Sequence, residues 1–580
     1  MERDGDVASW YSPDMDPTTS ELFDLLQTGW TLIAASLVLF MQAGFCCLEA
    51  GSVRHKNSIN VALKNIVDLC ISFAGFFVIG YALMFGLSQS GIIGAPTFLL
   101  DGIDDTTHFF FQATFCGTAA TIVSGGIAER CRFLPYVLIS GLIGILIYPI
   151  YGHWAWGEAG WLSQLGFHDF AGSSVVHMVG AGVALAGMQV LGARQGRFTA
   201  DGRSRSLPAS SMPLVALGVI ILTFGWIGFN GGSAPLGPSS ADIITATILA
   251  ACFGGLAALL INWAYGGLAR ADLVLNGVLG GLVAITAGAD CVSLPASMLI
   301  GIAGGIAVVI GTALLERLRL DDAVGAVPVH GLAGVVGILL TAVFAQETAL
   351  TDWNVGRVEA GHAELDRWGF LGIQALGAGA CALWAYLTGL IAWLIIGRLT
   401  QLRIGRFEET VGLNYSEHQV ANPVEELAVA INLAASGRGD EVPGRLDSAG
   451  GDLAGLAEAV RSLIGTTERQ LTVIKRFAAH LAEVQRGLVD HRQAGEDRLR
   501  ACLQETEVIG ERLGNLHDYL QEHASPGSLG ILLDLVGGLR DRLQTLREQL
   551  PPGLTAWAEV GQAAQQLDRV LGRLRAGGGR

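Results

Sequence analysis

Two histidines stand in apolar stretches that share one pattern. The first stretch runs from Asp169 to His177 and the second from Asp322 to His330, so an acidic residue precedes each ring by eight positions. A titratable ring inside an apolar membrane segment is costly and marks a functional site by default. The matched pair indicates a duplicated unit whose two rings meet at the repeat interface. The alternative is two buried histidines that are hydrogen-bonded within helix packing.

The composition indicates a polytopic membrane protein. The chain has 580 residues, of which 51% are hydrophobic and 15% charged, and its mean hydropathy is +0.47, which is too apolar for a soluble chain of this length. Its 79 glycines allow membrane helices to approach closely. The net charge of −16 does not favour nucleic-acid binding. The nine cysteines form no CxxC pair or Cys/His ligand spacing, so we expect no metal, no cofactor and no disulfide framework.

Apolar runs of roughly 18 residues or more predict an all-α fold with eleven transmembrane helices. The first run is too long for a signal peptide and follows an acidic N-terminus, so it is expected to remain as a membrane helix. The runs lie near 28–50, 61–87, 107–128, 134–155, 171–192, 213–234, 241–265, 273–290, 294–315, 329–347 and 370–398.

The loops between these runs alternate in charge. Basic groups gather in 54–56, 129–132, 194–205, 268–270 and 316–319, and the positive-inside rule places such loops in the cytoplasm. The N-terminus is therefore expected outside and the C-terminus inside the cytoplasmic (inner) membrane. The histidines fall on spans five and ten, which is the parity of a five-plus-five inverted repeat with an eleventh helix left over.

Beyond residue 410 the chain has no further run of span length. Two short amphipathic helices joined by a loop rich in Gly, Asp and Pro are followed by a heptad-like helical stretch that predicts a coiled coil or bundle. The expected parts are therefore an extracytoplasmic segment at 1–27, a membrane domain at 28–410, a cytoplasmic linker at 411–420, a helical module at 421–466 and a coiled-coil or helical-bundle region at 467–580.

Several ordered motifs in residues 20–418 resemble the ammonium transporter (Amt/Rh) family. They include Gln42-Ala-Gly-Phe-Cys-Cys-Leu-Glu-Ala-Gly51, Asp169-Phe-Ala-Gly172 through His177, Gly225-Trp-Ile-Gly-Phe-Asn-Gly-Gly-Ser233 and His330-Gly-Leu-Ala-Gly334. The resemblance implies a transport protein rather than an enzyme. It also implies a homotrimer in the lipid membrane, with one ammonium pore in each protomer.

The resemblance also implies roles for individual residues. An outer ammonium site would use aromatic faces and a hydroxyl acceptor, and cation–π attraction of about 1–2 kcal/mol suits a partly desolvated cation. The outer site would be formed by Phe115, Trp156, Phe229 and Ser233, with Phe115 and Phe229 as the gate, Trp226 lining the pore, Asp169 organising the outer site, and His177 and His330 handling ammonia and protons. From the residues alone, Trp156 could instead be an interfacial tryptophan, each Phe a core residue, and Asp169 a helix N-cap.

Two features depart from the family. Members commonly carry an aspartate five residues before the second histidine, where this chain has Gly325, so gating on the cytoplasmic side is expected to differ. The tail resembles a HAMP signal-relay module, as in ammonium sensors, and carries no kinase or cyclase motif.

Two functions therefore stay open. One is an ammonium transporter with a cytoplasmic signalling or PII-type partner, and the other is a sensor that conducts little or nothing. A carbon dioxide channel is disfavoured by Trp156 and Ser233.

Overall fold

The computed structural model describes residues 17–102, residues 105–420 and isolated positions between 429 and 569. The contacts within the chain divide it into two units, Met1–Val420 and Ala421–Arg580. The helical module predicted at 421–466 and the coiled coil predicted at 467–580 lie outside the continuously described residues, so they remain predictions.

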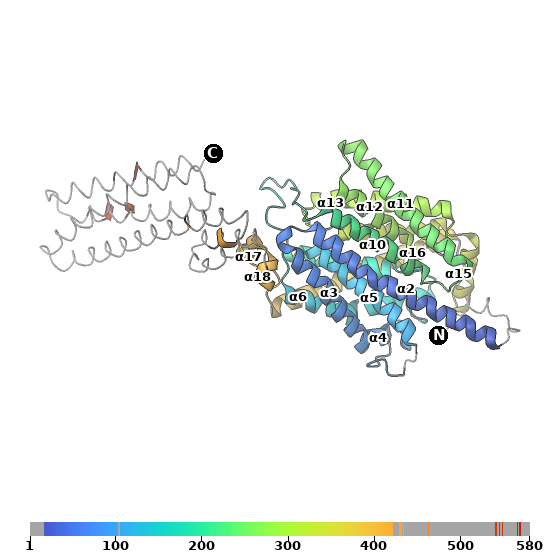
Figure 1. Ribbon diagram of the computed structural model, residues 1–580. Helices are drawn as coiled ribbons and strands as arrows, with labels where there is room; N and C mark the ends of the chain where they lie inside the picture. The colour runs from blue at the N-terminus through green and yellow to red at the C-terminus, as the bar shows by residue number, and fades with distance from the viewer. Residues whose placement is uncertain are drawn as a thin grey trace. The chain divides into compact units, whose positions relative to one another are not determined.

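The first five predicted spans are all helical (Figure 1). Several spans contain short π-helical or 3-10 pieces, and a two-stranded antiparallel hairpin, β1 (Ser88–Gln89) with β2 (Ile93–Gly94), follows the second. The helices of this half are α2 (Pro17–Ser52), η1 (His55–Asn57), α3 (Ser58–Gly75), η2 (Phe76–Gly80), α4 (Tyr81–Phe85), α5 (Thr106–Ile127), α6 (Phe133–Leu142), η3 (Ile143–Ile147), α7 (Tyr148–Trp156), α8 (Trp161–Gln164), η4 (Ser173–Met178) and α9 (Val179–Leu191).

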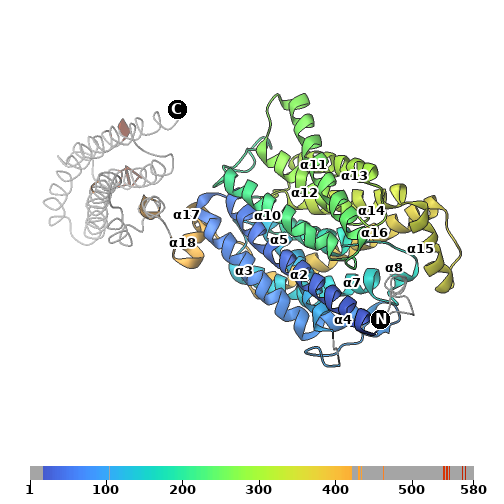
Figure 2. The same ribbon diagram turned by 45° about the vertical axis from the view of Figure 1, so that its right-hand side comes forward.

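The second half repeats this plan and adds a final long helix, α16, and two short helices at the end of the first unit (Figure 2). Its elements are α10 (Met212–Gly231), α11 (Pro238–Gly266), α12 (Ala271–Ile285), α13 (Leu294–Arg317), η5 (Val327–Leu332), α14 (Ala333–Phe344), α15 (Glu347–Glu359), α16 (Arg367–Leu399), α17 (Arg406–Val411) and α18 (Leu413–His418).

Ten helical stretches among the described residues are long and apolar enough to cross a membrane. They match ten of the predicted spans. The eighth predicted span, near 273–290, corresponds to α12, an apolar helix of only 15 residues. At 1.5 Å per residue it covers about 22 Å. The polytopic all-α fold is confirmed, and α12 is shorter than the sequence indicated because its chain turns after Ile285.

Small residues bring the helices of the second half together. The helices α11, α12 and α13 pack against one another, and α2 packs along α10. A Cβ atom on Gly281 of α12 would overlap the Ala250 carbonyl of α11, and one on Gly305 of α13 would overlap the Gly254 carbonyl. Close backbone approach of this kind is how membrane helices gain van der Waals contact. The glycine content of the chain thus acts in helix packing.

Both histidines lie on single π-helical turns. His177 lies on η4 and His330 on η5, and such turns inside α-helices frequently mark functional sites. In η4 the backbone amide of His177 donates to the carbonyl oxygen of Gly172, 3.1 Å away. Each π turn then continues into an α-helix, α9 or α14. The wider turn re-aims the ring relative to a regular helix.

Candidate functional site

The two predicted half-sites are built alike. The Asp169 carboxylate accepts hydrogen bonds from the backbone amides of Gly172, Ser174 and Val175 at 2.8–3.1 Å. The Asp322 carboxylate does the same for the three consecutive amides that begin at Gly325, at 2.8–3.0 Å. Both carboxylates therefore cap free backbone amides at the helix start that leads to a histidine. Asp169 is not the N-cap residue itself, because Gly172 occupies that position in η4.

Each half-site also has a left-handed glycine three residues after its aspartate. Gly172 has φ +107° and Gly325 has φ +86°, a backbone region that costs other residues about 1–2 kcal/mol. Gly325 occupies the position where the family commonly has an aspartate. Here it has the same conformation as Gly172, so the departure from the family makes the two halves more alike.

The two imidazoles meet in the protein interior. The Nδ1 atoms of His177 and His330 lie 3.2 Å apart, and the ring centroids are 5.2 Å apart with the planes at 22°. His177 is fully buried and His330 is 5% exposed. Two neutral rings can share one hydrogen bond only if one Nδ1 donates and the other accepts. Among the described residues, Nε2 of His177 has no hydrogen-bond partner, which leaves one buried polar atom for a small ligand.

A continuous series of aromatic contacts joins this pair to two predicted gate residues. The rings of Phe115 and Phe229 stack with centroids 4.0 Å apart, and both are buried. The Phe229 ring lies 5.5 Å from the His177 ring. Trp226 stacks on His177 at 5.3 Å and donates its indole N–H to the Thr286 hydroxyl at 2.9 Å. The structure thus brings together residues from α5, α10, η4 and η5.

Trp156 and Ser233 extend the series beyond the phenylalanine pair. The Trp156 ring lies edge-on to Phe115 with centroids 6.3 Å apart. Its indole N–H donates to the backbone carbonyl of Asp169 at 2.6 Å, so Asp169 fixes both the helix start and the tryptophan. Ser233 follows α10 and donates its hydroxyl to the Phe229 carbonyl at 2.8 Å. Both Trp156 and Ser233 are partly exposed, as a binding site open to solvent requires.

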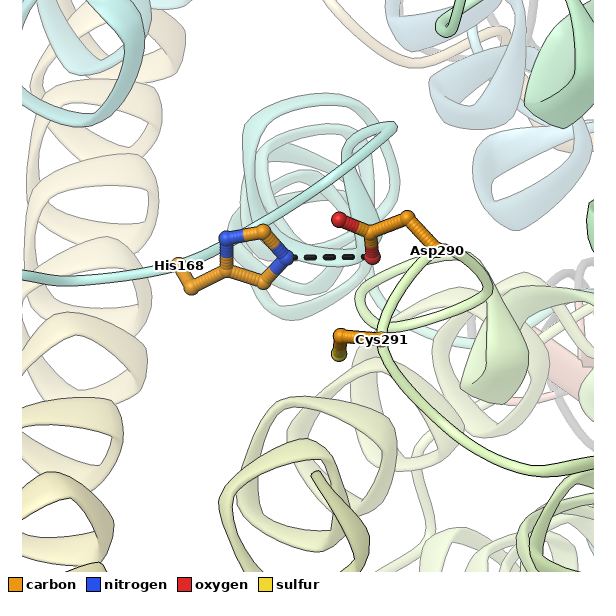
Figure 3. A group of neighbouring side chains, drawn as sticks. All are labelled: His168, Asp290 and Cys291. Carbon is orange, nitrogen blue, oxygen red and sulfur yellow. Dashed lines mark hydrogen bonds and ion pairs between the residues drawn. The ribbon is translucent and has the colours of Figure 1, made fainter. Parts of the chain in front are cut away.

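The loop that carries Asp169 is tied to the second half by a neighbouring hydrogen bond between His168 and Asp290 (Figure 3). Nε2 of His168 lies 3.1 Å from the Asp290 carboxylate, and the ligand atoms of His168, Asp290 and Cys291 all lie within 4.8 Å of one another. The set of donors is of the type that divalent metals accept. No metal site was predicted at these three residues, because their spacing along the chain matches no ligand motif. The pair itself holds the loop in place.

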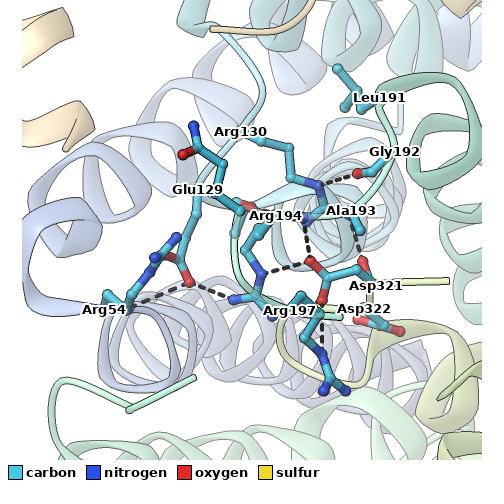
Figure 4. Close-up of polar contacts among 12 residues, drawn as sticks. Arg54, Glu129, Arg130, Leu191, Gly192, Ala193, Arg194, Arg197, Asp321 and Asp322 are labelled. Atoms are coloured by element: carbon cyan, nitrogen blue, oxygen red, sulfur yellow. Dashed lines mark hydrogen bonds and ion pairs between the residues drawn. The ribbon is translucent and has the colours of Figure 1, made fainter. Parts of the chain in front are cut away.

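At the opposite ends of the spans, a buried network of charges closes the bundle (Figure 4). Glu129 pairs with Arg54 and Arg194, and Arg194 forms an ion pair with Asp321 at 2.8 Å. Arg130 donates to the backbone carbonyl of Asp321 at 2.5 Å. Burial opposes the ionisation of Asp321, but the Arg194 guanidinium outweighs it and holds the pKa of that carboxyl well below its ordinary value. Pairing of this kind offsets the cost of burying charged groups.

The chain just before the second unit docks on this network. Glu409 of α17 pairs with Arg403 at 2.8 Å, and the Lys56 ammonium donates to the Glu409 carbonyl at 2.7 Å. Asn414 of α18 accepts from the backbone amide of Ile59 at 2.9 Å. The linker predicted at 411–420 is therefore helical and bonded to the first unit as far as His418.

Two residues near the histidines had no role predicted from the sequence. Phe45 lies 6.3 Å from the His330 ring, which extends the aromatic series past the histidines. Glu49, one turn further along α2, is 1% exposed. Both belong to the stretch from Gln42 to Gly51, whose mostly apolar character gave no indication of which face points inward. The four-residue spacing of Phe45 and Glu49, which puts both side chains on one helix face, was the sequence feature that could have linked them.

Comparisons with known proteins agree with this architecture. Residues 29–422 match the Ammonium Transporter Family. A putative ammonium transporter of Synechocystis is 46% identical over 417 residues, which cover 69% of this chain and 75% of that protein. Ammonium transporter Amt2 of Archaeoglobus fulgidus is 39% identical over 405 residues, covering 67% of this chain and 86% of its own length.

Solved structures give the same result. A structure named Sensor Amt Protein superposes with a TM-score of 0.66 at 37% identity, and covers 69% of this chain and 100% of that one. The Mep2 protein of Candida albicans superposes with a TM-score of 0.59 at 27% identity, covering 67% of this chain and 88% of its own.

The chain is therefore a multi-pass membrane protein of a transport family. It belongs to the ammonium transporter family, as its motifs predicted.

Proposed function

We propose that this protein moves ammonium across the cytoplasmic membrane through the aromatic series and the paired histidines. The observation that carries the proposal is the unbroken set of ring contacts from Trp156 through Phe115 and Phe229 to the two imidazoles. The family to which the chain belongs and the names of its relatives support ammonium as the substrate.

In this proposal the outer residues recognise the cation. Trp156 and Phe115 present aromatic faces, which attract a partly desolvated ammonium ion by about 1–2 kcal/mol, and Ser233 offers a hydroxyl oxygen. Phe115 and Phe229 form the gate, because their stacked rings are buried and leave no polar contact for a bare charge. Asp169 acts by positioning, since its carboxylate is already occupied by the helix cap.

Near the pore entrance, the cation loses its proton. A bare charge among apolar side chains is penalised by several kcal/mol, whereas ammonia is uncharged. Ammonia and the proton then travel separately, and the two imidazoles accept and donate both, because each neutral ring has one donor and one acceptor nitrogen. The two rings titrate as a coupled pair. Trp226 keeps His177 in place by stacking on it.

Electrophysiology on proteoliposomes tests the proposal. Wild-type protein should give an ammonium-elicited current. The double variant His177→Leu, His330→Leu should lose it by about 100-fold or more, because removing proton-transfer groups typically costs 10²–10⁴-fold. A matched control is Tyr386→Phe, which removes one hydroxyl hydrogen bond to Gln189 far from the rings. An unaltered current in the histidine variant would refute the proposed pathway.

The same proposal includes a topology and an assembly. The extracytoplasmic N-terminus, the cytoplasmic C-terminus and a homotrimer are consistent with the positive-inside rule and the family. The second unit would lie in the cytoplasm as a HAMP-like and coiled-coil extension with a signalling or PII-type partner. Cysteine accessibility at engineered positions near residues 20 and 440, together with mass measurement of the detergent-solubilised protein, tests these points.

A second candidate function is ammonium sensing with little or no conduction. The likeness to the structure named Sensor Amt Protein favours it, as does the chain of 160 residues in the second unit. Full-length protein and protein ending at Val420 should be compared in the same assay. Robust current from both would exclude a purely sensory protein.

A further inference from the structure

A buried carboxylate on α2 has no part in the function proposed above. Glu49 is 1% exposed and lies within the span Ser20–Ser52. An ionisable group at such a position is expensive and marks a function unless packing explains it. The amide N–H of Asn65 on α3 donates to Oε2 at 3.1 Å, and the Ser124 side chain and the Gly125 backbone also hydrogen-bond the carboxyl group. All three partners are neutral, so none of them balances the charge of a carboxylate.

Glu49 faces a cavity that also reaches the second histidine. Both Glu49 and His330 line this narrow cavity, whose interior has room for about one water molecule. The opposite wall includes Asn276 of α12 and the segment 324–326 before η5. Among the described residues that line this cavity, Glu49 is the only carboxylate.

The position of Glu49 along α2 places it past the histidine. Phe45, one turn earlier on the same helix face, lies against the His330 ring. Glu49 is four residues nearer to the Ser52 end of α2, roughly 6 Å along the axis. That end leads to Arg54, which belongs to the buried charge network. A species leaving the imidazole pair toward this end therefore meets Glu49 next.

The charged groups that surround Glu49 are otherwise engaged. On α3, the Lys64 ammonium donates to the Cys131 carbonyl at 2.8 Å, and Asp68 accepts from the hydroxyls of Thr121 and Tyr136. On η5, His330 is shared with its partner ring. None of these groups neutralises Glu49 by direct contact among the described residues, which leaves the carboxylate available to a mobile cation or proton.

We infer that Glu49 is the inner proton acceptor of the pathway and the place where ammonium is re-formed. The imidazole pair gives up a proton, so an N–H bond breaks and an O–H bond forms on the Glu49 carboxylate, directly or through a water molecule in the cavity. Ammonia arriving in the cavity takes that proton and becomes ammonium, and the carboxylate is restored. The ion then leaves toward the Ser52 end. This inference rests on the transport function proposed above.

The test compares Glu49→Gln with wild type in the full-length protein on proteoliposomes. Gln keeps the size and the contact with Asn65 but cannot take a proton. We expect the ammonium current to fall by about tenfold or more, while the uptake of neutral ammonia, followed by a pH dye inside the vesicles, stays within about threefold. A merely structural role would reduce both signals together and would overturn the inference. A Glu49→Gln current equal to that of wild type would also overturn it.

Asp68→Asn is the matched control, because it removes a second buried membrane carboxylate that does not line the cavity. An equal and selective loss of current in Asp68→Asn would overturn the specific role of Glu49. Glu49→Asp keeps the acid and should retain more current than Glu49→Gln; the reverse order overturns the inference.

If Glu49→Gln fails to fold, infrared difference spectra of wild type supply the decision. Added ammonium should change the intensity of a carboxylic-acid C=O band, and this band should shift in Glu49→Asp. If wild type shows no such band, the inference is overturned. Absence of current in wild type would refute the transport function and this inference together, whereas normal wild-type current with unchanged Glu49→Gln refutes only the inference.

Discussion

The two half-sites share a local design but differ in their surroundings. In each, an aspartate caps a helix start, a left-handed glycine follows three residues later, and a π-helical turn presents a histidine. Around Asp169 the neighbours are the Ser174 hydroxyl, at 2.6 Å, and the Trp156 indole. Beside Asp322 stands Asp321, which is bonded to arginines. The same arrangement of capping aspartate, glycine and π-helical turn therefore occurs both beside a partly open aromatic site and at a face closed by ion pairs.

This difference shows how a duplicated unit acquires two roles. The cap and the turn place the ring, and they depend only on residues within the same short segment. The residues next to the cap decide whether the end of the pathway meets a neutral aromatic surface or a rigid charged one. The following predictions test that division, from the largest expected effect to the smallest.

The largest loss of stability should come from Asp321→Ala. Removing one partner of a buried ion pair typically costs about 3–5 kcal/mol, and this substitution takes away the carboxylate that pairs with both Arg194 and Arg197. Thermal unfolding of the purified protein in detergent measures it. Glu316→Ala is the control, because Glu316 pairs with Arg197 while its side chain is 28% exposed, and exposed pairs contribute about 0–1 kcal/mol. Equal shifts in the two variants would mean that the network does not stabilise this face.

Acid should remove the same contribution without a mutation. The pKa of Asp321 is held low in the folded protein, so its stabilisation is fully present above the unfolded value of about 3.9. It is lost as the pH falls from that value through the lower folded pKa, because only the unfolded chain gains a proton over this range. The drop in unfolding temperature below about pH 4 should be smaller in Asp321→Asn than in wild type. Parallel pH curves would contradict the assignment.

Replacing the two capping aspartates should have similar effects on stability but different effects on transport. Asp169→Ala and Asp322→Ala each leave three backbone amides without their acceptor, and each should cost about 2 kcal/mol. Only Asp169→Ala should also weaken recognition at the outer mouth, because the main-chain carbonyl that accepts from Trp156 belongs to the segment that the Asp169 carboxylate holds in place. Ammonium concentration dependence of the current measures this. An equal rise in the half-saturating ammonium concentration for Asp322→Ala would show that the two ends recognise the cation equally.

The smallest effects are expected at the two glycines. Gly172→Ala and Gly325→Ala each place an alanine in the left-handed backbone region, which should lower the free energy of unfolding by about 1–2 kcal/mol. A methyl group on Gly172 would also lie 2.8 Å from Val176 and 3.1 Å from Trp156, whereas one on Gly325 would meet only the Asn276 amide group. Gly172→Ala should therefore be the less stable variant and the poorer conductor. The opposite order, measured by thermal unfolding and current, would mean that Asn276 cannot move aside.

The transport class, the membrane helices and both histidines were predictable from the sequence by itself. These depend on local information: a run of apolar residues predicts a span wherever it occurs, and the interval from Asp169 to His177 recurs from Asp322 to His330 within one short segment each. The family motifs also identified every residue of the aromatic series that reaches from Trp156 to the histidines.

The repeated pattern predicted that the two rings meet although they lie 153 positions apart in the chain, but other contacts were decided only by the tertiary structure. Phe45 reaches His330 because α2 packs along α10 of the second half. The adjacent residues Asp321 and Asp322 look interchangeable in sequence, yet one is bonded to arginines and the other to backbone amides. Glu49 faces the inner cavity for the same reason. Side-chain direction and charge pairing depend on contacts between segments that are distant in the sequence. Local sequence patterns therefore cannot predict them.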